Sequence, residues 1–289
     1  MTESEGPAVR RLRLRTELRR LREEAGLSRE SVVEKLGWSL SKLARIESGA
    51  VGIVADDVEA VLRVYGVEEP TQVQAMLSLT GSGRPRKWWN AYKDVLTPSH
   101  LRFIALEAEA VEINHCAPLV LPGLLQTEDY IRAIIRRFRV GESPEERVEK
   151  LVAIRLTRQQ QLMERPDRPR LTFVLDEAAL RRPVGGQAVM QRQLEHLVKL
   201  LGEPNIAIEV VPFEIGAYPG MKGPSTILKF GAQAQSTVLY VEGPAGDMLY
   251  RDDERELREH DISYAQMRTL SLGPEGSRRL IEKLIQKLD

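Results

Sequence analysis

Apolar residues recur at helical spacing on both sides of a glycine near the N-terminus. Within Leu27–Gly49, LSRESVVEKLGWSLSKLARIESG, the apolar positions before and after Gly37 follow a period close to that of a helix, which indicates two amphipathic helices. Ser28 and Ser39 stand where these helices would begin, and a serine oxygen there can accept an orphan backbone N–H. Glycine tolerates the backbone of a tight turn. The segment is therefore predicted to be a helix-turn-helix, in which the second helix enters the DNA major groove.

The second predicted helix leaves one face outward. Leu43 and Ile46 are spaced to point inward, whereas their neighbours face solvent. An ordinary αα-hairpin has the same pattern when one side of it meets water, so the pattern alone leaves both interpretations open. If the segment binds DNA, the outward residues are the candidates for reading bases: Leu40, Ser41, Lys42, Ala44 and Arg45.

Positive charge is concentrated around this motif. Residues 10–45 contain eleven Lys and Arg against five Asp and Glu, a net charge of +6, whereas residues 46–81 contain one Arg against six acids, a net charge of −5. The whole chain carries 42 basic and 42 acidic residues. Any attraction to DNA must therefore come from this local patch, and the balance of charge argues against a protein that coats nucleic acid without specificity.

The phrase RLREEAGLSRESVVEKLG followed by SKLARIESG resembles the repressor-type DNA-binding domain of the XRE family. The resemblance places Leu40 where such repressors often carry a base-reading glutamine. Leucine cannot form the bidentate contact with adenine, so it offers apolar contact to a thymine methyl or none. Direct readout then falls on Ser41, Lys42 and Arg45. Arg45 can reach guanine O6 and N7, or it can grip phosphate and specify nothing.

Other positions of the motif are expected to contact the DNA backbone. Arg19, Arg22 and Arg29 are interpreted as phosphate contacts, and Arg29 stands where the family often carries a glutamine that touches phosphate. Glu47 stands where the family uses an acid to pair within the domain, so it is left out of the DNA contacts. The predicted DNA-binding set also includes the cap positions Ser28 and Ser39.

Length and pattern predict two domains. Residues 1–80 complete a five-helix, all-α domain with further helices at 55–67 and 71–79, and residues 81–93 read as a linker because glycine and proline interrupt it. The N-terminus has no apolar core of the kind a signal peptide needs, and no apolar run reaches membrane-spanning length. The chain is therefore expected to be cytoplasmic, with no membrane partner.

From residue 94 to 289 the pattern mixes helices and strands, which predicts an α+β domain with a small mixed sheet. Segments rich in β-branched and aromatic residues are predicted to be strands. The predicted helices cover 98–114, 128–139, 144–165, 186–201, 253–271 and 274–288, and the predicted strands cover 171–177, 205–213, 225–231 and 237–243.

Long phrases in this second domain resemble the antitoxin-like C-terminal domain that follows an XRE helix-turn-helix in many bacterial regulators. They are PLVLPGLLQTEDYIRA at 118–133, VLDEAALRRPVGG at 174–186, PFEIGAYPGMKGPSTILKF at 212–230 and VLYVEG at 238–243. The resemblance implies a transcription regulator, often encoded beside a small partner protein. The alternative is an antitoxin that mainly sequesters that partner and regulates its own operon.

Catalysis is not expected. Glu107, Glu109 and Glu112 share one predicted helix, and Asp176 and Glu177 end a strand, but carboxylates of this kind are more often surface ion pairs. The chain has no phosphate loop, dinucleotide-binding glycine motif, nucleophile elbow or zinc motif. One cysteine and four histidines show no metal-ligand spacing, so neither a metal nor a cofactor is expected. An enzyme with a DNA-targeting module is the least favoured alternative.

A binding surface in the second domain is favoured over a catalytic one. The glycine- and proline-rich loop 216–224 is interpreted as a lid or docking surface, with a plain turn-rich connection as the alternative. Trp88 and Trp89 are expected to anchor the linker in a core or interface rather than to stack on bases. The candidate ligand- or partner-binding residues are Trp88, Trp89, Asp176, Arg181, Tyr218 and Met221.

These features together predict a sequence-specific regulator that binds double-stranded DNA as a homodimer. One recognition helix supplies too little affinity and specificity alone, so a palindromic operator with half-sites about 34 Å apart, or a multiple of that distance, is expected. The second domain would supply the dimer contact and sense a partner protein or ligand.

Overall fold

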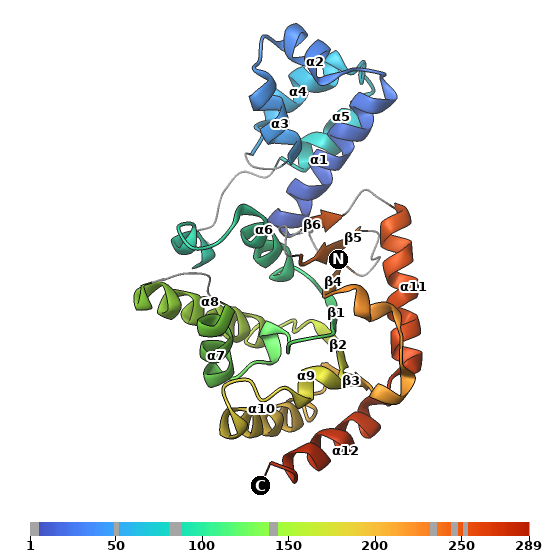
Figure 1. The fold of residues 1–289 in the computed structure, drawn as a ribbon. Coiled ribbons are helices and arrows are strands. Elements are labelled where there is room, and N and C mark those ends of the chain that lie inside the picture. The colour runs from blue at the N-terminus through green and yellow to red at the C-terminus, as the bar shows by residue number, and fades with distance from the viewer. Residues whose placement is uncertain are drawn as a thin grey trace. The chain divides into compact units, whose positions relative to one another are not determined.

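The computed structural model describes residues 6–48, 52–80, 88–138, 144–231, 236–243, 248–250 and 254–288. The chain forms two compact units, Met1–Lys87 and Trp88–Asp289. The division lies within the segment 81–93 that the sequence predicts to be a linker, and residues 81–87 of that segment lie outside the described residues. Figure 1 shows the elements of both units, and each unit is considered by itself.

The first unit is entirely helical in its described part, which confirms the predicted fold class. Its apolar positions close one core, which is formed by Leu14, Leu18, Leu21, Val32, Leu43, Val58, Val61, Leu62, Tyr65, Met76 and Leu79. The five helices are α1 (Pro7–Glu24), α2 (Arg29–Leu36), α3 (Leu40–Ser48), α4 (Ala55–Val64) and α5 (Pro70–Ser78).

The second unit is built on a mixed sheet, as the predicted α+β class requires. The strand order in the described residues is β3-β2-β1-β4-β5-β6. β1 pairs in parallel with β2, and β2 with β3, whereas β4, β5 and β6 continue the sheet in antiparallel pairing. The strands are β1 (Glu112–Ala117), β2 (Arg170–Asp176), β3 (Ile206–Val211), β4 (Ser225–Phe230), β5 (Ser236–Val241) and β6 (Met248–Tyr250).

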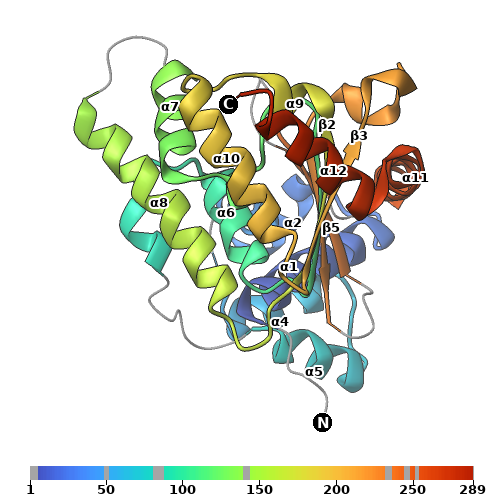
Figure 2. The same cartoon turned by 90° about the horizontal axis from the view of Figure 1, so that it is seen from below.

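Helices cover both faces of this sheet. Figure 2 shows α6, α7, α8 and α10 on one side and α11 on the other. α12 packs along β3, where Ser277 Oγ accepts a hydrogen bond from Val210 N at 2.8 Å and closes part of the strand's free edge. The bounds are α6 (Pro98–Glu107), α7 (Glu128–Phe138), α8 (Glu145–Met163), α9 (Glu177–Arg181), α10 (Gln187–Leu200), α11 (Glu254–Leu270) and α12 (Gly273–Ile285), with short 3₁₀ helices η1 (Trp88–Tyr92), η2 (Gly123–Leu125), η3 (Phe213–Ile215) and η4 (Pro219–Lys222).

The helix predicted over 98–114 is wrong in its second half. α6 ends at Glu107, and the chain enters the central strand β1 at Glu112. Val111 N already donates to Lys229 O at 2.9 Å, and β1 then pairs with β2 and β4. Pairing with two distant strands overrides the helix-forming composition of this segment. Glu109 and Glu112 therefore do not share a helical face.

No helix within the described ranges combines the length and apolar character that a membrane span requires.

Candidate nucleic-acid interface

The turn between α2 and α3 forms as its sequence predicts. Ser28 Oγ accepts a hydrogen bond from Ser31 N at 3.1 Å, and Ser39 Oγ accepts one from Lys42 N at 3.1 Å. Gly37 adopts the left-handed conformation with φ 64°, which favours glycine. Trp38 N donates back to Val33 O at 2.9 Å and completes the end of α2. The two serine caps and the glycine turn are confirmed.

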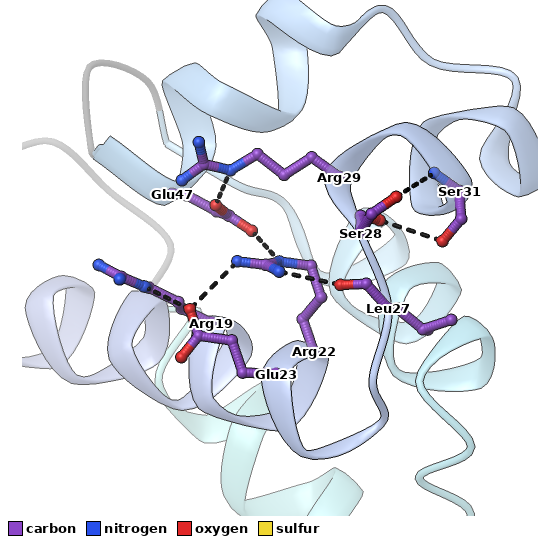
Figure 3. A network of polar contacts seen from close by, with 8 residues as sticks. All are labelled: Arg19, Arg22, Glu23, Leu27, Ser28, Arg29, Ser31 and Glu47. Atoms are coloured by element: carbon purple, nitrogen blue, oxygen red, sulfur yellow. Dashed lines mark hydrogen bonds and ion pairs between the residues drawn. The ribbon is translucent and has the colours of Figure 1, made fainter.

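One buried carboxylate joins the three helices of the motif (Figure 3). The side chain of Glu47, at the end of α3, is only 3% exposed. Its Oε1 accepts from Arg22 Nε of α1 at 2.7 Å, and its Oε2 accepts from Arg29 Nε of α2 at 2.6 Å. Glu47 therefore pairs within the domain, as its position in the motif predicts.

Arg22 lies inside the domain rather than on its surface. Its side chain is 9% exposed, and its Nη1 donates to Leu27 O at 2.9 Å while its Nε is held by Glu47. A guanidinium in this position links α1 to the segment before α2 and to the end of α3. The placement does not suit the phosphate contact predicted for Arg22, and we assign the residue a structural role.

The other two predicted phosphate contacts lie together on the surface. Arg19 of α1, Arg29 of α2 and Arg45 of α3 line a hollow of about 460 Å³. The guanidinium of Arg19 is hydrogen-bonded to Glu23 at 2.9 Å and lowers the pKa of that carboxyl. Three guanidinium groups against one lining carboxylate make a site that favours an anion such as a DNA phosphate. The full set of lining residues is Arg19, Arg29, Ser41, Ala44, Arg45 and Glu47.

The side chains on the outward face of α3 differ in their exposure and contacts. Leu40 is 46% exposed, and Ser41 and Arg45 are also exposed. Lys42 instead bonds to Asp57 of α4 at 3.1 Å and lies 3.6 Å from the centroid of the Trp38 ring. Leu40, Ser41 and Arg45 are therefore exposed on α3, and Lys42 is held against its own domain. No local sequence signal links Asp57 to Lys42, because the two residues lie on different helices.

The predicted binding residues of the second unit do not form one group. Tyr218 Oη donates to Asp176 Oδ2 at 2.8 Å, and burial together with that carboxylate raises the pKa of Tyr218. Arg181 instead bonds to Glu177 at 2.5 Å, one turn away on α9. Met221 is 63% exposed on η4.

The tryptophan pair belongs to η1, a separate element at the start of the second unit. The Trp88 and Trp89 rings meet edge to face with centroids 5.6 Å apart, and Trp89 is buried. The burial of Trp89 is consistent with the anchoring interpretation.

Three of the carboxylates considered for acid–base chemistry, Glu107, Glu112 and Glu177, lie in ion pairs. Glu107 is buried and accepts two hydrogen bonds from Arg158, at 2.5 and 2.9 Å, while its burial acts to raise its pKa. Burial also acts to raise the pKa of Glu112, but bonds from Arg170, Asn114 and Lys229 outweigh it and lower that pKa to about 2. Within the described part of the chain, no group of three or more His, Cys, Asp or Glu could hold a metal ion.

These features place the first unit in the helix-turn-helix class of DNA-binding domains. A family model described as a helix-turn-helix domain matches residues 13–76, and one described as "Domain of unknown function (DUF5753)" matches residues 101–283. The second match covers more than half of the chain, so the protein belongs to the family that this domain of unknown function defines. No curated protein and no solved structure matches the chain. The helix-turn-helix domain indicates DNA binding, consistent with transcriptional regulation.

Proposed function

We propose that the chain is a sequence-specific transcriptional regulator that binds double-stranded DNA. The observation that carries the proposal is the continuity of two surfaces. Ser41 and Arg45 lie on the exposed face of α3 and also line the arginine hollow. A helix set into the major groove therefore brings base-reading and phosphate-binding groups to the duplex together.

The residues divide into two roles. Ser41 and Arg45 read base edges, and Arg45 has the reach for a bidentate contact to guanine O6 and N7. Arg19 and Arg29, which also line the hollow, bind phosphates. Glu47 supports this arrangement because it holds Arg29 by its Nε and leaves the two terminal nitrogens of the guanidinium to the ligand.

The regulator acts as a homodimer on a palindromic operator. A single recognition helix buries too little surface for the specificity a genome demands, and two helices double the readout. The second unit supplies the dimer contact and senses a partner protein or a ligand. Light scattering at working concentration tests the oligomeric state, and a monomer mass both free and on operator DNA would refute it.

Selection of bound fragments from sheared genomic DNA tests the specificity. The full-length protein is used at near-physiological salt beside Arg45→Ala and Arg63→Ala. Arg63 is exposed on α4 and outside the lining of the hollow, so its variant controls for the loss of one positive charge. We expect a short palindrome that Arg63→Ala preserves and Arg45→Ala relaxes at one position, worth about 1–3 kcal/mol of discrimination. Absence of any enriched motif would contradict the proposal.

A further inference from the structure

Three polar side chains form a row across the inner strands of the sheet. His115 of β1 lies opposite Thr226 of β4, and Thr226 lies opposite Tyr240 of β5. Residues opposite each other in an antiparallel pair share one face. Thr226 Oγ1 lies 2.7 Å from His115 Nδ1, and Tyr240 Oη lies 3.5 Å from His100 Nδ1 of α6, so both ends of the row are hydrogen-bonded. Helix-covered positions of this kind are usually apolar, since an unpaired buried polar group costs free energy.

The helices above this row bring two arginines to it. The Phe103 ring of α6 stacks on Tyr240 with centroids 4.1 Å apart, which places α6 over the same face. Arg158 of α8 lies 5.4 Å from the Phe103 centroid and is bound by both carboxylate oxygens of Glu107. Arg155 lies one turn earlier on α8, on the same side of the helix. The cluster therefore combines one neutralised arginine and a second arginine with a polar strand face.

No carboxylate among the described residues is hydrogen-bonded to Arg155 in this way. Within the described residues its hydrogen bond goes to the neutral amide oxygen of Gln126, at 3.0 Å. Burial and the charge of Arg158 lower the pKa of Arg155 to about 10, and the field of Glu242 acts in the opposite direction. The guanidinium therefore stays charged at neutral pH, and most of its donors remain for another acceptor.

Solvent reaches this cluster. His115 lies on an inner strand with neighbours on both sides, yet it keeps part of its surface accessible, as do Arg155 and Arg158. Its Nδ1 is taken by Thr226, whereas the described residues provide no hydrogen-bond partner for its Nε2. Arg155 and His115, which have hydrogen-bonding groups left over, are therefore accessible members of the cluster, whereas Thr226, Tyr240 and Phe103 are buried.

We propose that the cluster of Arg155, His115, Thr226 and Tyr240 binds a small organic carboxylate. Arg155 holds the carboxylate, because its planar fork matches two oxygens. His115 provides a second polar contact through Nε2, and the buried Thr226 and Tyr240 support the strand face beneath it. One cation that no described carboxylate hydrogen-bonds suits a monoanion better than a doubly charged phosphate. The inference identifies a ligand for the sensing role of the proposed function, but its test needs no DNA, so the two proposals fail separately.

The test is an NMR titration of the full-length protein labelled with ¹³C at histidine. The chain has four histidines, and the spectrum of His115→Asn identifies the His115 signal. The probes are sodium benzoate and sodium acetate, with benzamide and acetamide as their neutral counterparts. We expect a saturable shift of the His115 signal with benzoate or acetate, and at least tenfold weaker binding of the matching amide.

Variants of Arg155 complete the test. Arg155→Gln should weaken carboxylate binding at least tenfold, and Arg155→Lys at least threefold because an ammonium lacks the fork. Arg192→Gln removes an exposed arginine of α10 that pairs with Asp129 of α7 and is not a member of the cluster, and it should bind like the wild type. If the spectrum of Arg155→Gln lacks the native His115 signal before any ligand is added, that variant has lost the native fold. Carboxylate binding by Arg155→Lys then decides the test. The proposal is overturned if neither carboxylate gives a saturable shift, if amides bind equally, or if the deciding variant binds unchanged.

Discussion

The carboxylate of Glu47 accepts a hydrogen bond from Nε of Arg22 at 2.7 Å, in an ion pair whose two side chains are at least nine-tenths buried. The pair connects the end of α3 to the last full turn of α1. Removing one partner of such a pair leaves an uncompensated charge in the interior, which destabilises a fold more than the intact pair stabilises it. Glu47 therefore determines where α3 stands relative to the rest of the motif.

Glu47→Gln should loosen the helix-turn-helix. The amide cannot neutralise Arg22 and Arg29 together, so we expect the free energy of local opening across residues 29–48 to fall by about 3 kcal/mol. Hydrogen exchange followed by mass spectrometry on the full chain measures this value. Glu34→Gln is the matched control, because Glu34 is exposed on α2, and it should change opening by less than about 0.5 kcal/mol. Equal exchange in the two variants would contradict the role of Glu47.

Arg19 and Arg22 should affect DNA binding differently although both belong to the basic run of α1. Arg19 lines the hollow, so Arg19→Ala should reduce the slope of log K against log salt by about 0.9, the value for one phosphate. Arg22 is internal, so Arg22→Ala should lower the stability of the domain. For the protein that remains folded, the slope of log K against log salt should stay at the wild-type value. Fluorescence anisotropy at four salt concentrations measures both slopes, and identical slopes would reject the distinction.

Leu40 should make the protein sensitive to a thymine methyl group. The side chain is exposed at the start of α3, and burying one methyl is worth about 0.8 kcal/mol. Replacing thymines of the selected operator by uracil, one at a time, should weaken wild-type binding about fourfold at one position. Leu40→Ala should remove that difference. If no uracil substitution separates the two proteins, Leu40 makes no such contact.

His115 should make stability depend on pH. Burial and the charge of Arg158 lower its pKa from 6.5 to about 3. Between these values the unfolded chain binds a proton that the folded chain does not, so the free energy of unfolding falls as pH falls through this window. From pH 7 to pH 5 the contribution of His115 is about 2 kcal/mol.

The comparison for this prediction is His115→Asn, whose amide can keep the contact with Thr226 but does not titrate. Urea unfolding at both pH values should show that the wild type loses about 2 kcal/mol more than the variant. The same loss in both proteins would mean that His115 already carries its ordinary pKa in the fold.

The helix-turn-helix could be predicted because its signals are local. Ser28, Gly37 and Ser39 act on backbone groups within three residues of themselves or at a single turn, and the apolar period reports directly which face of a helix is buried. The strand segments at 171–177, 205–213, 225–231 and 237–243 were recognisable from their β-branched and aromatic residues. Only their partners and order required the structure.

Segments decided by distant neighbours were not predicted. The residues that lead into β1 have a helix-forming composition, and a helix was therefore predicted over 98–114. The residues of β1 instead pair with β2 and with β4, more than fifty positions away. Arg22 has the same chemistry as the arginines around it, and only its approach to Glu47, twenty-five residues along the chain, separates an internal link from a surface contact. The local composition does not reveal such pairings, because each pairing forms only when two elements pack together.

The sequence by itself determined the class of the first unit, the α+β character of the second and the local turn that exposes α3, because capping, periodicity and charge density act over a few residues. The tertiary structure alone decided which arginines line the hollow, that Lys42 is held by Asp57, and that His115 meets Thr226 across 111 positions of sequence. The physical reason is that burial and pairing of a polar side chain are properties of the packed neighbours, not of the residue.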